Sequence, residues 1–180
     1  FCRKIRDSRK SILQGGNSMR GKTLIAYFSA SPSRRTERVA HKIADVIGAD
    51  LYEIVPAVPY TQDDLNWNDE KSRTSTEMRD PNSRPALGGA PIDLAPYNVI
   101  FVGFPIWWYV APHIINTFLE SHDLTGKIIV PFVTSGGSSM GQTTVHLRPS
   151  AEGALMKEGR RFEMGETPMA INSWIAALGI

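Results

Sequence analysis

Cysteine is nearly absent from this chain, which has one, Cys2, among 180 residues. A single thiol excludes an intrachain disulfide and a metal site built from several cysteine ligands. The four histidines show no paired spacing typical of metal ligands; they are His41, His113, His122 and His146. We therefore predict no metal site and expect a reduced, cytoplasmic setting.

Long apolar stretches and a basic surface are also missing. No segment approaches the roughly 20 apolar residues that cross a bilayer, so no membrane span is expected. Five of the 20 basic residues and one of the 18 acidic residues lie within residues 1–18, which leaves 15 basic and 17 acidic residues in the rest. Because the remainder has no basic stripe, nucleic-acid binding is not expected.

Residues 1–18 form a basic arm without the apolar run of a secretory signal, since their longest apolar pair is Ile12-Leu13. We interpret the arm as appended or loosely ordered, as chain termini often are. A tether to an acidic partner or to a membrane surface is the alternative. Residues 19–180 are then expected to form a single domain.

Apolar runs and helical patterns alternate from residue 23 onward. Strands are predicted at 23–30, 50–55, 98–104, 127–134 and 160–164, although Pro131 is unusual inside a strand. Helices are predicted at 36–47, 112–119 and 169–178, with the start of another at 142–147. This alternation indicates an α/β fold with a five-stranded parallel sheet and helices on both faces.

Residues 57–96 interrupt the alternation. They are rich in proline, aspartate, asparagine and serine, and only a weak helical pattern appears near 69–78. A connection of this length often carries function; a surface excursion with one short helix is the simpler interpretation.

The loop at 29–36 follows the first predicted strand and leads into a helix. Its hydroxyls and the unpaired N–H groups of a helix N-terminus are typical of an anion site. No glycine lies between residues 23 and 47, which excludes a Walker loop and a dinucleotide fingerprint. Helix capping by serine or threonine is the alternative.

Two further loops are expected at the same edge, because ligands of such sheets bind beyond the carboxyl ends of the strands. The first, 104–112, has three consecutive aromatic residues that could border a flat ring or simply plug the sheet. The second, 134–141, has three glycines whose backbone N–H groups could face a ring, or that form a flexible turn. The three loops together predict a phosphorylated planar ligand, and FMN fits best.

Several segments of the chain resemble the flavodoxin-like family, in particular a bacterial branch of short single-domain FMN proteins. They are TLIAYFSAS with ERVAHKIA, the long run from GFPIWWYVAPH to TSGGSSMG, the terminal SWIAALG, and YTQDDLNWNDEKSRTSTEMRDPNSRPAL. The resemblance covers nearly everything after the first twenty residues. It implies a sheet of strand order 2-1-3-4-5 with non-covalent FMN at the strand ends.

By position, the resemblance implies three groups of cofactor-binding residues. The phosphate group is Ser29, Ser31 and Thr36, with Ser33 and Arg34 as further candidates in the same turn. The ring would be bordered by Pro105, Ile106, Trp107 and Trp108, and closed on its other side by Thr134, Ser135, Gly136, Gly137 and Gly141. The phosphate loop departs from the family pattern, because Pro32 stands at the usual glycine position and Thr36 comes about two residues late.

Three functions remain open from the sequence. The first is a redox protein that transfers electrons through FMN to a partner protein or a small-molecule acceptor, with no catalytic side chain. The second is an FMN-dependent reductase of quinone-type acceptors with a nicotinamide donor, in which Tyr109, His113 and the long segment 57–96 could shape a substrate pocket. His113 is then also a candidate for proton delivery, although a histidine at a helix start is more often a residue of the helix face. The third is a binding module on the same fold without cofactor. The weakly acidic charge favours the reductase over a dedicated carrier, which is usually strongly acidic.

Overall fold

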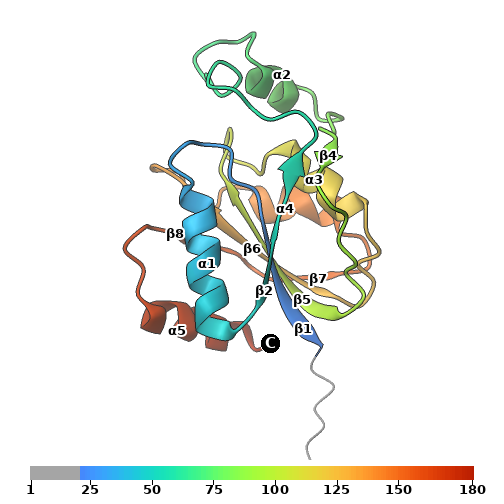
Figure 1. Ribbon diagram of the computed structural model, residues 1–180, viewed down its shortest axis with the longest axis vertical. Coiled ribbons are helices and arrows are strands. Elements are labelled where there is room, and N and C mark those ends of the chain that lie inside the picture. Colours follow the sequence, from blue (N-terminus) through green and yellow to red (C-terminus); the bar gives the residue numbers. More distant parts are fainter. Residues whose placement is uncertain (1–20) are drawn as a thin grey trace, which may run out of the picture.

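The computed structural model describes residues 21–180 (Figure 1). Its strands are β1 (Lys22–Tyr27), β2 (Asp50–Glu53), β3 (Val55–Pro56), β4 (Leu87–Gly88), β5 (Tyr97–Pro105), β6 (Ile128–Thr134), β7 (Leu155–Met156) and β8 (Arg160–Phe162). Its helices are α1 (Arg35–Ile47), α2 (Arg73–Arg79), α3 (His113–Glu120), α4 (Thr143–Leu147), which continues as the 3₁₀ turn η1 (Arg148–Ser150), and α5 (Pro168–Leu178). The basic arm predicted at 1–18 lies outside the described residues.

One parallel sheet forms the centre of the molecule, with the order β2-β1-β5-β6-β7 and with β8 also paired to β6. In terms of the five predicted strands this is the order 2-1-3-4-5, so the fold expected from the sequence is confirmed. The register pairs Tyr27 with Gly103 and Pro105 with Thr134. The last residues of β1, β5 and β6 therefore lie at one edge, where the three predicted loops begin.

Apolar side chains alternate between the two faces of the sheet because successive residues of a strand point to opposite sides. One face, with Ile25 and Phe101, packs against α1 and α5; the other, with Leu24 and Ile100, packs against α3 and the end of α4. Figure 1 shows these helices on opposite sides of the sheet. Both faces are covered, which explains why the strand sequences are nearly continuous apolar runs.

The last strand differs from the prediction of a single strand at 160–164. It is split into β7 and β8, which pair with opposite ends of β6. The carbonyl of Ile129 accepts the N–H of Lys157 at 2.9 Å, and Pro131, two residues on, faces the same neighbour. Because proline has no N–H, the ladder is interrupted there, and the edge strand leaves the sheet between its two pieces.

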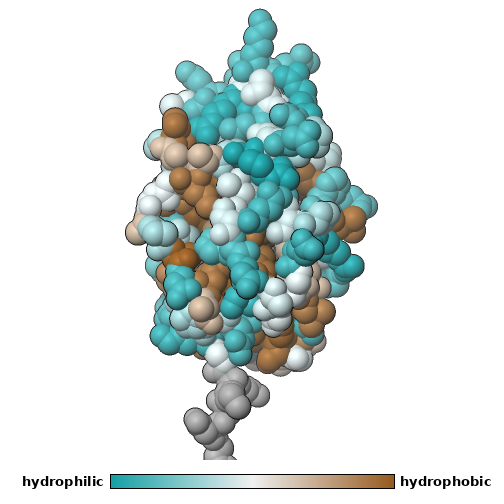
Figure 2. Space-filling model, turned by 90° about the vertical axis from the view of Figure 1, so that its right-hand side faces the viewer, coloured by the Kyte–Doolittle hydropathy of each residue, from teal (hydrophilic) through white to brown (hydrophobic). Residues whose placement is uncertain are grey.

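The excursion at 57–96 carries α2, whose first turn is capped by the Ser72 hydroxyl accepting the N–H of Ser75. The weak helical pattern near 69–78 is thus a real helix that begins at Arg73. The second predicted strand ends earlier than expected, at Glu53, and the chain then pairs β3 with β4 at the base of the excursion. Figure 1 shows α2 above the sheet edge, and Figure 2 shows that this end of the visible face is mostly hydrophilic.

Within residues 21–180, no helix has the length and apolar character needed to cross a bilayer. The same part of the chain has no group of three or more His, Cys, Asp or Glu residues that could hold a metal ion.

Candidate functional site

The first loop borders a small cleft of about 150 Å³ at the sheet edge. Ser29, Ser31 and Thr36 line it together with Arg35, and α1 begins there. The first N–H groups of a helix have no partner within the helix, so this cleft offers backbone donors beside hydroxyls. On its far side the cleft is closed by residues of the other two loops: Pro105, Ile106, Thr134, Ser135 and Gly136.

Thr36 and Thr134 connect two of these elements directly. Their hydroxyl oxygens lie 2.8 Å apart, and both side chains are buried. This hydrogen bond joins the first turn of α1 to the end of β6, and it fixes the width of the cleft between them.

Arg34 and Ser33, also candidates for the site, do not line the cleft. The guanidinium of Arg34 donates to both carboxylate oxygens of Glu37, to Glu53 and to the carbonyl of Ser29. The Ser33 hydroxyl lies 3.0 Å from that of Ser31. The structure therefore directs the Arg34 charge to carboxylates, and it leaves Arg35 as the cation that borders the cleft.

The aromatic loop is a tight hairpin. Trp107 and Val110 exchange two backbone hydrogen bonds, with N···O distances of 3.0 and 3.1 Å. The two residues between them, Trp108 and Tyr109, both have positive φ, at 46° and 67°, as a type I′ turn requires. Such a turn normally uses Asn-Gly. A left-handed conformation costs a non-glycine residue about 1–2 kcal/mol, so the hairpin holds two aromatic side chains in place at an energetic cost.

The two indoles of this hairpin have different surroundings. Trp107 packs edge-on against Phe28 and Tyr60, with ring centroids 5.6 and 5.4 Å apart. It acts as the hydrophobic plug that was one interpretation of this loop. Trp108 is 44% exposed and Tyr109 is 70% exposed. Of the two indoles, Trp108 is therefore the one placed to meet a ligand from solvent.

The third loop is built around backbone turns. The Ser135 hydroxyl accepts the N–H groups of Gly137 and Ser138, at 3.2 and 2.7 Å. Gly141 has φ +55°, and a Cβ there would lie 2.5 Å from the carbonyl oxygen of Tyr109. Only glycine allows this approach, so Gly141 lets the third loop pack against the aromatic hairpin.

A second cavity, of about 460 Å³, lies beside the hairpin. Ile106 lines both this cavity and the cleft at α1, so the two spaces adjoin. Its remaining lining residues come from three segments that are distant in sequence: Leu65, Trp67, Thr74, Trp107, Trp108, Tyr109 and Ser138. No charged side chain is among them.

Leu65, Trp67 and Thr74 were not predicted as site residues. They belong to the 57–96 excursion, which was considered as a whole for a substrate pocket but without naming any of its residues. Trp67 is 73% exposed. A tryptophan flanked by Asn66 and Asn68 in a proline-rich segment was the one signal that could have drawn attention to it.

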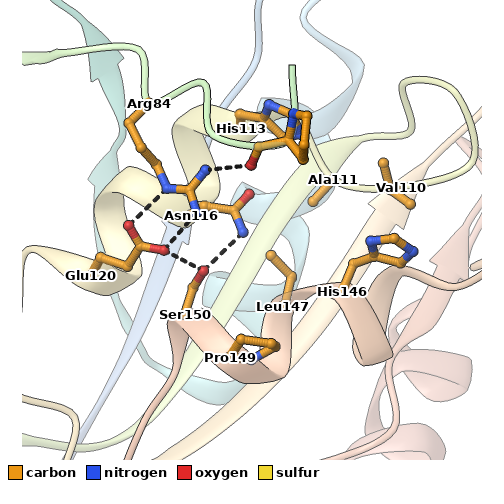
Figure 3. A pocket seen from close by; sticks show the side chains of 11 residues that line it. Arg84, Val110, Ala111, His113, Asn116, Glu120, His146, Leu147, Pro149 and Ser150 are labelled. Carbon is orange, nitrogen blue, oxygen red and sulfur yellow. Dashed lines mark hydrogen bonds and ion pairs between the residues drawn. The ribbon is translucent and has the colours of Figure 1, made fainter. Parts of the chain in front are cut away.

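His113 lies elsewhere. It lines a separate cavity of about 240 Å³ between α3, α4 and the end of the excursion (Figure 3). There Arg84 donates to both carboxylate oxygens of Glu120, which also accepts the Ser150 hydroxyl at 2.6 Å. Burial, more than any other influence, lowers the pKa of His113. The proton-delivering role considered for His113 gains no support, because it borders neither the cleft nor the cavity beside the hairpin.

The arrangement fits a group with a phosphate at one end and a flat ring at the other. The cleft at α1 supplies hydroxyls, unpaired N–H donors and Arg35, which suit an anion. The adjoining cavity is uncharged and walled by aromatic rings, which suits a planar ring system. The three loops predicted from sequence thus meet at one edge, as expected for this fold.

Comparison with known proteins identifies the fold family. The sequence model of the flavodoxin family matches residues 22–178. The chain belongs to the flavodoxin family. Two solved structures of candidate flavoproteins, from Bacteroides eggerthii and Bacteroides uniformis, are each 46% identical to it, with TM-scores of 0.83 and 0.80. They cover 89% and 87% of this chain, which in turn spans 99% and 98% of theirs.

A flavoprotein from Lactobacillus acidophilus, solved in complex with FMN, is 21% identical and has a TM-score of 0.66. The match covers 89% of this chain and 99% of that one, and at this identity it shows the shared fold alone. No curated protein matches the chain. The resemblance to flavodoxins stated from the sequence is confirmed.

Proposed function

We propose that this flavodoxin binds FMN non-covalently and transfers electrons through it. The observation that carries the proposal is the pair of adjoining spaces at the strand ends, one polar beside α1 and one aromatic beside the hairpin. Family membership supports FMN as the cofactor, as the sequence predicted. When bound, FMN supplies one- and two-electron transfer, for which the protein need only hold and shield the ring.

The phosphate would be held by Ser29, Ser31 and Thr36 together with the first N–H groups of α1. Arg35 adds a positive charge at the same cleft. Backbone donors at a helix N-terminus and hydroxyl groups together favour a doubly charged anion. Arg34 and Ser33, which do not line the cleft, would act on the shape of the loop.

The ring would lie between the hairpin and the third loop. Pro105 and Ile106 border the junction of the two spaces, and Trp108 offers an aromatic face. Thr134, Ser135 and Gly136 close the other side, and Gly137 and Gly141 shape the turn that holds them. Apolar walls exclude water from the ring, which affects its reduction potential through the local dielectric.

A second candidate function is the reduction of a small acceptor of quinone type. It is favoured by Trp67, an exposed residue of the excursion that lines the aromatic cavity together with the exposed side chains of Trp108 and Tyr109. The electron acceptor would then be a planar molecule and not a redox partner protein. Oxidation of a nicotinamide donor in the presence of a quinone, compared with reduction of a carrier protein, separates the two candidates. A single thiol in the chain supports a reduced, cytoplasmic setting for either.

Tryptophan fluorescence tests the proposal directly. Three of the four tryptophans, Trp67, Trp107 and Trp108, line the aromatic cavity, whereas Trp174 packs under the opposite face of the sheet. Added FMN should quench most of the emission and give a visible flavin spectrum that remains after gel filtration. Unquenched emission with no retained flavin would instead support a cofactor-free binding module.

A further inference from the structure

Arg34 holds a position that the sequence did not predict. It immediately precedes α1 with φ 48° and ψ 39°, and its side chain makes no capping hydrogen bond to the helix. Residues that precede a helix are usually extended, and the left-handed conformation is sterically unfavourable for an arginine. An unfavourable backbone conformation that persists beside a candidate site indicates that surrounding contacts hold the residue there.

The constraint is visible in the contacts of the guanidinium. Nε and Nη2 donate to the two carboxylate oxygens of Glu37 at 2.7 and 3.0 Å, and Nη2 also reaches Glu53 at 2.6 Å. Nη1 donates to the carbonyl of Ser29 at 2.8 Å. One side chain thus ties together the phosphate loop, the first turn of α1 and the end of β2.

Without Arg34, the negative charges of Glu37 and Glu53 would not be neutralised, and both lie near the proposed site for a phosphate dianion. Glu37 follows Thr36, which lines the cleft, and Glu53 ends the strand next to β1. Arg34 holds the pKa of Glu37 below its usual range. Burial, and then the charges of Glu53 and Glu37, raise the pKa of nearby Tyr27 to about 12. Without the arginine, both acids would repel an incoming phosphate.

The contact with Ser29 has a second effect. In a trans peptide the C=O and the following N–H point in opposite directions. Holding the Ser29 carbonyl therefore also fixes the direction of the Ala30 N–H, in a stretch of the loop that lines the cleft. Pro32 cannot donate a hydrogen bond, so the remaining N–H groups of this loop matter more.

We propose that Arg34 is a positioning residue for the phosphate site, which neutralises Glu37 and Glu53 and fixes the loop without touching the phosphate. The proposal rests on the proposed binding of FMN. It assigns the cation that meets the phosphate to Arg35, which lines the cleft. A lysine at position 34 cannot replace the forked contacts, because its ammonium lacks the planar set of donors.

The test compares affinities for FMN and for riboflavin, which lacks the phosphate, in the full chain freed of flavin. Arg34→Gln should weaken FMN binding about tenfold or more, because two uncompensated carboxylates then act on a dianion, and should leave riboflavin binding within about threefold. Arg34→Lys should lose much of the FMN affinity as well. Adding Glu37→Gln and Glu53→Gln to Arg34→Gln removes the repulsion of the phosphate by the two carboxylates. This triple variant should recover most of the FMN affinity.

Salt gives an independent readout. FMN binding to Arg34→Gln should strengthen as ionic strength rises, because screening weakens the repulsion by the two acids. FMN binding to the wild type should weaken with salt, and Arg35→Gln should remove most of that dependence. A stability change alone would alter neither slope.

The outcomes separate this inference from the proposed function. If the triple variant binds FMN as weakly as Arg34→Gln while riboflavin binding is unchanged, repulsion by Glu37 and Glu53 does not cause the loss, and the inference that Arg34 neutralises them is wrong. If the wild type binds FMN more tightly than riboflavin and Arg34→Gln has the same two affinities, Arg34 has no role in the site. If the wild type does not distinguish FMN from riboflavin, the proposed phosphate site itself is refuted.

Discussion

At the scale of single residues, the two indoles of the hairpin separate stability from binding. Trp107 packs against Phe28 and Tyr60, whereas Trp108 is 44% exposed. Trp107→Ala should lower the free energy of unfolding by roughly 3 kcal/mol, the low end for a tryptophan, since it leaves a cavity in an aromatic cluster where the indole is only partly buried. Trp108→Ala should change it by less than about 0.5 kcal/mol but weaken FMN binding by about 0.5–1.5 kcal/mol. Chemical unfolding and FMN titration of both variants measure this, and equal effects of the two on both quantities would contradict the assignment.

The left-handed backbone of Tyr109 makes a second prediction. Tyr109→Gly and Tyr109→Ala remove the same exposed aromatic side chain, but only glycine adopts φ 67° without steric cost. The glycine variant should therefore be more stable than the alanine variant by about 1 kcal/mol. Their denaturant midpoints provide the measurement. A more stable alanine variant would mean that the turn is unstrained in solution.

Burial of His113 makes the stability of the fold depend on pH. Its pKa is lowered from 6.5, chiefly by burial, so the unfolded chain takes up a proton that the folded state resists. The free energy of unfolding should therefore fall as pH drops below about 6.5. His113→Gln, which has no proton to take up, should reduce that loss. The measurement is the free energy of unfolding of both proteins between about pH 7 and pH 5, on either side of the ordinary histidine pKa. Identical pH dependence in the variant and the wild type would count against a buried, neutral His113.

At the scale of elements, the excursion is fastened to the sheet through Tyr60. Its hydroxyl donates to Glu77 on α2 at 2.6 Å, and its ring carries the guanidinium of Arg73 at 4.0 Å and packs against Trp107. Tyr60→Phe leaves Glu77 without this donor, and it should cost about 1–2 kcal/mol and speed proteolysis within 57–96. Tyr52→Phe, which removes an exposed bond to the Ala90 carbonyl, serves as the control and should do less.

Elements with regular patterns could be predicted from the sequence, and those set by distant contacts could not. The parallel strands and the helices at 36–47 and 169–178 follow from apolar periodicity, which depends on local sequence. The sequence analysis marked Pro131 as unusual inside a strand. Its effect, however, is to split the neighbouring edge strand into β7 and β8, which the local sequence of that strand does not signal. The hairpin at Trp107–Val110 has no glycine or asparagine to signal its turn.

The same limit applies to the site. Its three loops were predicted because parallel strands bring their carboxyl ends to one edge. Arg34 was grouped with the phosphate residues by its place in the loop, and its pairing with Glu53, 19 residues away, is a tertiary contact. Trp67 reaches the aromatic cavity only through the fold of the excursion.

At the scale of the whole molecule, the cleft at α1 and the aromatic cavity share Ile106, and the proposed binding of FMN needs both. A ligand that uses both should bind better than one that uses only the second. FMN and riboflavin differ by the phosphate alone, so the pair measures the contribution of the cleft.

The most direct measurement is calorimetric titration of the flavin-free protein with FMN and riboflavin, in the wild type and in the double variant Ser29→Ala, Ser31→Ala. The wild type should bind FMN more tightly than riboflavin, because only FMN has the phosphate that the cleft would hold. The double variant should lose about 1–3 kcal/mol of FMN binding, as expected for hydrogen bonds to a charged group, and bind riboflavin as before. Equal affinities of the wild type for the two flavins, or an equal loss for both in the variant, would contradict the placement of the phosphate at α1.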